Sequence, residues 1–190
     1  MRVRVLLPYC AAISRTRGMA SPLLAVPLAL VLVASSTEHA AWAGCEARAM
    51  RVLGTSLEPR IHNGATVDAL IGEDCAFRTT KGNILLFVSG AQSIPLAKVV
   101  AAEPGDRWSV GADGGIIVND EPLRNSAGAP YRLTADRSAL LRLYQTEYAG
   151  VIPEGTYLLM GERPDGSLDS SQLGLVHRKD VIGKIERVHE

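Results

Sequence analysis

The chain has 190 residues, of which 47% are hydrophobic, 21% charged and 5% aromatic. This length suits one domain with an appendage, and the composition is ordinary for a globular protein. The formal net charge is zero and the 20 Lys and Arg residues are scattered along the sequence. Because nucleic-acid-binding domains carry a clustered basic excess, we expect no nucleic-acid partner.

The first 43 residues differ from the rest, because a flank with four arginines precedes an apolar stretch from Met19 to Ala34. Sixteen helical residues cover roughly 24 Å, slightly less than the ~30 Å hydrocarbon core of a bilayer. We interpret residues 1–43 as a basic N-terminus and a single-pass anchor in the cytoplasmic (inner) membrane, with residues 44–190 on the extracytoplasmic side. A cleaved signal ending at Ala41-Trp42-Ala43 and initiation at Met19 stay open as alternatives.

Three cysteines are distributed around this apolar stretch. Cys10 precedes it and would lie in a reducing cytoplasm, whereas Cys45 and Cys75 follow it and would meet an oxidising compartment. Two thiols there favour a disulfide across a loop of about thirty residues, worth ~3 kcal/mol. Two independent thiols are the alternative.

From residue 44 onward the apolar runs are short, rich in β-branched residues and separated by Gly, Pro and Asn turns. Such runs predict strands, because glycine reaches positive φ in the turns without a steric penalty. The first predicted strands are Thr66–Ile71, Ile84–Val88, Leu96–Ala102 and Ile116–Val118. A hairpin turn is predicted at Asn119-Asp120, followed by a loop over residues 125–131.

One short helix is predicted after Thr134, a suitable N-cap, since apolar residues then recur at helical spacing until Gly150. Strands over Thr156–Met160 and Val181–Arg187 close the chain. We predict a mostly β domain of coiled antiparallel sheets or a partly open barrel, with a small insert at about 107–150.

Lys98 interrupts an otherwise apolar strand and on strict alternation shares a face with Leu96 and Val100. Burial of a lysine lowers its pKa because desolvation disfavours the ammonium, and a lysine with a lowered pKa can act as a general base. A lysine on an edge strand, with its amine in water, is the alternative.

Two further polar segments are candidates for chemistry. Ser56 lies in a turn beside Gly54, where a hydroxyl is exposed and backbone N–H groups can face a developing oxyanion. A polar run at 161–171 follows an apolar strand. Each also fits an ordinary turn or a solvated loop.

In this order, the segments resemble signal peptidase I and its Ser/Lys relatives, including the peptidases that mature conjugative pilins. The resemblance extends from about Val52 to Ile185, nearly the whole exported part. Its segments are Val52-x-Gly54-Thr55-Ser56-Leu57-Glu58-Pro59, Asn63–Val67, Lys81–Phe87, Ala97–Asp106, Gly161–Gly174 and Gly183-Lys184.

The resemblance implies the role of each site residue. Ser56 is the expected nucleophile and its N–H the oxyanion donor, Lys98 is the general base, Ser167 hydrogen-bonds and orients Lys98, and Asp169 supports that segment. No cofactor or metal is expected. The expected walls of the pockets that admit small substrate side chains are Leu57 and Phe87.

Several positions depart from the family pattern. Val99 stands where a second basic residue is usual, and Gly54 where some relatives carry a serine that adds an oxyanion donor.

In the polar run, Glu162 and Arg163 replace an Asp-Asn pair, and Ser171 replaces the arginine that would pair with Asp169. Because a buried, unpaired carboxylate is costly, we expect Asp169 to be solvated or to pair with Arg163 or Arg178.

The family's substrate is an exported protein whose N-terminal signal is cut after small residues at the outer membrane face. The expected partners are therefore preproteins and a lipid membrane. A specialised peptidase for one substrate, such as a conjugative pilin precursor, is the first alternative. A catalytically inactive envelope protein with the same fold is the second. The self-cleaving repressors share the chemistry, but the export segment argues against them. No oligomeric state is predicted.

Overall fold

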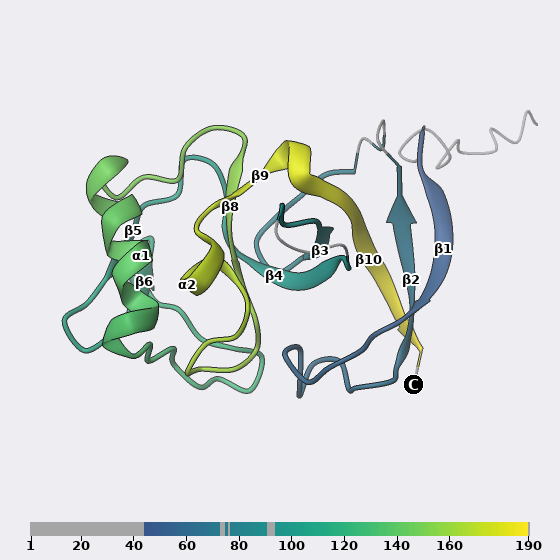
Figure 1. The fold of residues 1–190 in the computed structure, drawn as a ribbon, viewed down its shortest axis with the longest axis horizontal. Helices are drawn as coiled ribbons and strands as arrows, with labels where there is room; N and C mark the ends of the chain where they lie inside the picture. Colours follow the sequence, from purple (N-terminus) through teal and green to yellow (C-terminus); the bar gives the residue numbers. More distant parts are fainter. Residues whose placement is uncertain (1–43, 73–74, 76, 91–93, 190) are drawn as a thin grey trace, which may run out of the picture. The chain divides into compact units, whose positions relative to one another are not determined.

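The computed structural model describes residues 44–72, 75, 77–90 and 94–189 (Figure 1). The predicted membrane anchor or signal in residues 1–43, and Cys10 with it, lies outside these ranges. Within them, no helix combines the length and the apolar character needed to span a bilayer.

A seven-stranded antiparallel sheet is the larger of the two sheets in the described chain. Its strands, in spatial order, are β1 (Glu46–Arg51), β2 (Thr66–Ile71), β10 (Val181–His189), β3 (Ile84–Phe87), β4 (Leu96–Ala102), β8 (Thr156–Met160) and β9 (Val176–His177). The predicted mostly β, antiparallel class is confirmed. Because β1 and β9 lie at the two edges, the strands of the described chain form an open sheet, not a closed barrel.

A smaller, three-stranded sheet lies between β4 and β8 in the sequence. It contains β5 (Trp108–Val110), β6 (Ile116–Val118) and β7 (Glu121–Pro122), and is followed by helix α1 (Ala135–Glu147), which lies beside β5 (Figure 1). An isolated antiparallel bridge between Arg107 and Val151 joins the two ends of this insert, after β4 and before β8. The predicted helix is thus confirmed after Thr134, although the Thr134 side chain makes no capping hydrogen bond.

The sequence predicted β2, β4, β6 and β8 with the bounds that the structure has, and it missed β1, β5 and β9. Edge strand β1 reads EARAMR and is almost wholly exposed, so it lacks the apolar run on which the prediction depends. The remaining elements are two short helices, α2 (Ser170–Leu173) and the 3₁₀ turn η2 (Arg178–Asp180).

The large sheet is covered on both faces, and β3 shows how the two faces differ. All four of its residues are buried. Ile84 and Leu86 pack with Leu57, whereas Leu85 and Phe87 pack with Val100 on the opposite face. This division follows from the two-residue repeat of a strand. It decides which apolar side chains can reach a site beside Leu57.

Cys45 and Cys75 form a disulfide that joins the start of edge strand β1 to the segment after β2. The bond closes a loop between residues 30 apart in sequence. It therefore restricts the unfolded chain, and its removal should lower the free energy of unfolding by about 3 kcal/mol. Urea denaturation of Cys45→Ala/Cys75→Ala against the wild type measures this difference.

Reduction provides the control for the disulfide prediction. A thiol reductant should lower the urea midpoint of the wild type and leave that of the double variant unchanged. Equal midpoints for all four samples would contradict a stabilising role for the bond.

Candidate active site

Ser56 lies in a turn between β1 and β2, which we call the nucleophile turn (residues 53–63) after the role expected of Ser56. Backbone hydrogen bonds between Val52 and the Gly64–Ala65 pair close the base of this turn. Inside it, the Asn63 Oδ1 accepts from the Gly54 N–H at 2.9 Å. Gly54 has a φ of +97°, which a residue with a Cβ rarely adopts. The turn therefore presents Ser56 from a hydrogen-bonded frame.

Lys98 lies on β4, an interior strand between β3 and β8, and is only 3% exposed. Its amine therefore does not reach water from a sheet edge, which was the alternative for this residue. Lys98 Nζ donates to Ser56 Oγ and to the Ala97 carbonyl, each at 2.9 Å. Burial lowers the pKa of Lys98 below its ordinary 10.5, and the carboxylate of Asp169 opposes this shift in part.

The end of β8 brings the two side chains together. β8 pairs with β4, so that Met160 lies opposite Val99, next to Lys98. Two residues later the Glu162 N–H donates to the Ser56 carbonyl at 2.7 Å. The nucleophile turn is thereby attached to the strand that neighbours Lys98, although Ser56 and Lys98 are 42 residues apart in sequence.

A cavity of about 190 Å³ opens beside Ser56 and Lys98. Apart from these two residues and Arg51 its lining is apolar, with contributions from β1, the nucleophile turn, β2, β3, β4 and β10. Leu53 and Ile94 line it and remain 82% and 71% exposed. A hydroxyl and an amine at the side of an apolar, open-ended cavity suit an apolar segment with small side chains.

The two predicted pocket walls differ in where they lie. Leu57 lines the cavity and is 1% exposed. Phe87 does not line it, because it points to the opposite face of β3, where it packs with Leu85 and Val100. Leu86, one residue earlier, takes the expected place. The prediction for Phe87 was wrong by one residue, since adjacent side chains of a strand point to opposite faces.

Ser167 and Asp169 are both buried next to the end of β8. The Ser167 hydroxyl donates to Asp169 Oδ2 at 2.6 Å. Lys98 has Ser56 and the Ala97 carbonyl as its hydrogen-bond partners. The expected bond between Ser167 and Lys98 is therefore not formed in this structure, and Ser167 is committed to the carboxylate instead.

Asp169 is fully buried, and hydrogen bonds satisfy its carboxylate, while no cation of the described residues forms a salt bridge with it. Oδ2 accepts from the Gly161 N–H, the Ser167 N–H and the Ser167 hydroxyl. Oδ1 accepts from the Ser171 N–H at the start of α2. Three backbone donors and a hydroxyl thus replace the cation of the family pattern.

Neither arginine considered as a partner for Asp169 serves that role. Arg163 pairs with Asp165 at 3.2 Å on the surface. Arg178 donates to the Cys75 carbonyl and lies over the Phe77 ring. The expectation that Asp169 is either solvated or paired with an arginine was therefore wrong.

The Ser56 backbone N–H, the expected oxyanion donor, finds no protein acceptor within the described chain.

The sequence did not predict two residues of the small insert that bind the segment after β8. Tyr131, which is 3% exposed, donates its hydroxyl to the Gly161 carbonyl. Asn125 donates to the Glu162 carbonyl at 2.8 Å. Both lie in the predicted loop over residues 125–131. The one sequence signal there is an aromatic residue within a polar loop.

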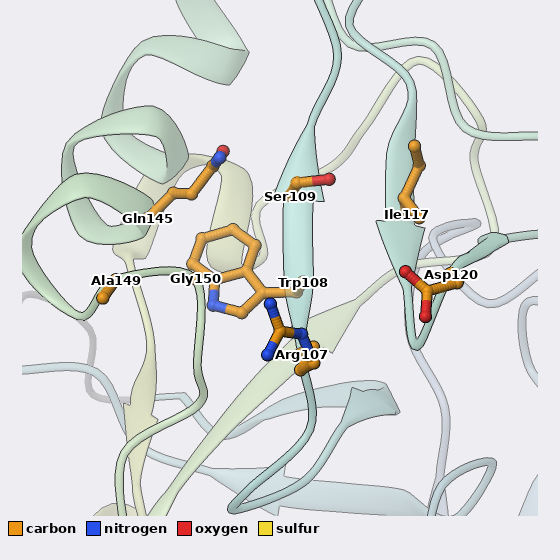
Figure 2. A pocket seen from close by; sticks show the side chains of 8 residues that line it. All are labelled: Arg107, Trp108, Ser109, Ile117, Asp120, Gln145, Ala149 and Gly150. Carbon is orange, nitrogen blue, oxygen red and sulfur yellow. The ribbon is translucent and has the colours of Figure 1, made fainter.

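A second hollow of about 270 Å³ lies in the small insert (Figure 2). Its walls come from β5, β6 and the C-terminal end of α1, among them Arg107, Trp108 and Gln145. None of the site residues predicted from the sequence lines it. Among its described lining side chains, no hydroxyl is hydrogen-bonded to a basic group.

Comparisons with known proteins identify the family of this chain. The family model "Signal peptidase, peptidase S26" matches residues 23–189. Signal peptidase IB of Staphylococcus aureus strain COL is 26% identical over 146 residues, which cover 70% of this chain and 73% of the relative. The protein of the same name from strain Mu50 gives the same values.

Among solved structures, a signal peptidase I from Enterococcus faecalis V583 has 21% sequence identity and a TM-score of 0.40. The match covers 57% of this chain and 97% of that one. The family model spans well over half of the sequence and includes every site residue described above. The chain therefore belongs to the signal peptidase family, peptidase S26.

Proposed function

We propose that this chain is a serine endopeptidase that removes N-terminal signal peptides from exported proteins, with Ser56 as nucleophile and Lys98 as general base. The observation that carries the proposal is the 2.9 Å contact between Lys98 Nζ and Ser56 Oγ at the side of an apolar cavity. Membership of the signal peptidase family supports the substrate class.

The reaction follows from the burial of Lys98. The neutral amine takes the proton of the Ser56 hydroxyl as Oγ forms a bond to the scissile carbonyl carbon. The Ser56 N–H, which is free of protein acceptors in the described chain, donates to the oxyanion. When the C–N bond breaks, the protonated Lys98 returns the proton to the leaving amine. Lys98 then activates a water that hydrolyses the acyl-enzyme, which regenerates Ser56.

The Cys45–Cys75 disulfide supports an extracytoplasmic site of action. Disulfides persist in oxidising compartments and are rare in the cytosol. Signal peptides are removed from proteins that have crossed the membrane, so the compartment and the proposed substrate agree. We propose that the domain acts on the extracytoplasmic side of the cytoplasmic membrane.

Cleavage of a substrate panel tests the function. The protein, incubated with several unrelated preproteins and pilin precursors, should cut each preprotein once, after a small residue at the end of its signal. N-terminal sequencing of the products locates the cut. Preproteins with a bulky residue at that position are the control and should stay intact, because the resemblance to signal peptidase I implies cleavage after small residues.

The panel also separates a general from a dedicated peptidase. Cleavage of most preproteins supports general signal removal. Cleavage of pilin precursors alone would contradict it in favour of a dedicated maturation peptidase. An intact panel, with the protein folded, would overturn the proposed activity.

A further inference from the structure

Glu162 is a buried carboxylate that the proposed reaction does not use. It is 3% exposed and directly follows Gly161 at the end of β8. Its Oε2 accepts from the Ser126 N–H at 2.7 Å, and its Oε1 lies 3.9 Å from Arg60 Nη1. A carboxylate removed from water is retained only where partners of this kind compensate for its desolvation.

The main chain of Glu162 makes two further contacts. Its N–H donates to the Ser56 carbonyl at 2.7 Å, and its carbonyl accepts from Asn125 Nδ2 at 2.8 Å. Arg60, the ion-pair partner, belongs to the nucleophile turn and donates to the Gly82 carbonyl at 2.7 Å. Glu162 therefore contacts the nucleophile turn at two points and the insert at two points.

The insert segment that reaches Glu162 is itself well ordered by internal bonds. Asn125 Oδ1 accepts from the N–H groups of Ala127 and Ala129, at 3.1 and 2.9 Å. The same side chain thus shapes its own loop with its oxygen and holds Glu162 with its nitrogen. We call residues 125–128 the insert loop.

We propose that Glu162 is a positioning residue that links the insert loop to the nucleophile turn and so holds Ser56 beside Lys98. This inference rests on the proposed function of Ser56. It makes the small insert part of the catalytic apparatus, although no insert residue lines the cavity at Ser56. A nucleophile displaced by about 1 Å loses on the order of 10²-fold in rate, so a contact that fixes Ser56 has a large effect on kcat.

Two variants break the link at different bonds. Glu162→Gln removes one oxygen acceptor and the charge facing Arg60 but keeps the size of the side chain. Asn125→Asp keeps the acceptor that shapes the insert loop and removes the donor to the Glu162 carbonyl. Each should lower kcat by about tenfold, with KM within about twofold, because the cavity that binds substrate is untouched.

The pH profile separates positioning from electrostatics. The pKa of Lys98 responds to its burial and to Asp169. The Glu162 charge is not among these causes. Glu162→Gln should therefore keep the wild-type midpoint of the kcat profile while the plateau falls, and the plateau should fall in Asn125→Asp as well. Glu154→Gln, the same change at an exposed glutamate before β8, is the matched control and should keep wild-type kcat.

Amide hydrogen exchange gives a readout that does not depend on activity. The Glu162 N–H and the Ile61 N–H, which donates to the Leu57 carbonyl, report on the nucleophile turn. Both should exchange about tenfold faster in Glu162→Gln and Asn125→Asp, under conditions where amides in β4 keep their protection.

The comparison of the wild type with Ser56→Ala reports on the proposed function, and exchange in the turn reports on the link. Failure of one is thus distinguishable from failure of the other. Wild-type exchange in the turn for both variants would overturn the inference. A shifted pH midpoint in Glu162→Gln, or a kcat loss explained by a smaller folded fraction, would overturn it as well.

Discussion

Replacing Lys98 with methionine is expected to lower kcat for preprotein cleavage by about 10³–10⁴-fold. The amine lies 2.9 Å from Ser56 Oγ, and no other basic side chain of the described residues contacts that hydroxyl. Methionine is unbranched like lysine, is only one atom shorter, and suits the apolar surroundings. The fold should therefore survive, and the loss should measure the missing base. Single-turnover cleavage of a preprotein measures the change.

Comparison variants make this result specific. Lys81→Met removes an exposed lysine that takes no part in the contact between Ser56 and Lys98, and it should keep wild-type kcat. Ser56→Ala should lower kcat at least as far as Lys98→Met. The double variant should be no worse than the poorer single variant, because residues that act as a unit lose activity together. Additive losses would contradict a shared proton transfer.

The pH dependence gives a second test of Lys98. Its burial lowers the pKa, so the neutral amine becomes the major form at a pH below the ordinary 10.5. Since the neutral form is the base, kcat should rise with pH through this lowered pKa and then level off. A rate that does not change from pH 5 to 9 would argue against Lys98.

The sequence predicted the strands of this site better than the contacts between its side chains. The apolar strand around Lys98 left burial and an edge position both open, and the structure places that lysine on an interior strand at 3% exposure. Short apolar runs likewise defined β2, β4, β6 and β8. A strand prediction needs only local periodicity, which these segments have.

Contacts between distant segments could not be predicted in the same way. The face on which Phe87 points depends on where β3 starts its alternation, and a shift of one residue exchanges Phe87 with Leu86. The partners of Asp169 are mostly backbone N–H groups, which every sequence offers at every position. Charge counting considered arginines only and therefore missed them.

Replacing Asp169 with asparagine should lower the free energy of unfolding by about 2–4 kcal/mol. The carboxylate accepts four hydrogen bonds in a fully buried place, three of them at Oδ2. An amide keeps one acceptor oxygen and turns an NH₂ group toward donors on the other side, which leaves buried N–H groups unpaired. Chemical denaturation measures this loss.

The matched control is Asp165→Asn, the same change four residues earlier. Asp165 is exposed and pairs with Arg163 on the surface, so its replacement should change the free energy of unfolding by less than about 0.5 kcal/mol. Equal losses at positions 165 and 169 would contradict a special role for the buried carboxylate.

Asp169→Asn should also move the midpoint of the kcat profile to lower pH. The Asp169 charge raises the pKa of Lys98 against the larger effect of burial. Without that charge the pKa of Lys98 falls further, and the midpoint of the kcat profile moves to lower pH. The plateau falls at the same time, because Asp169 holds the Gly161 N–H and Gly161 adjoins the residue that binds the Ser56 carbonyl. A midpoint that moves to higher pH would mean that Asp169 does not act on Lys98 by charge.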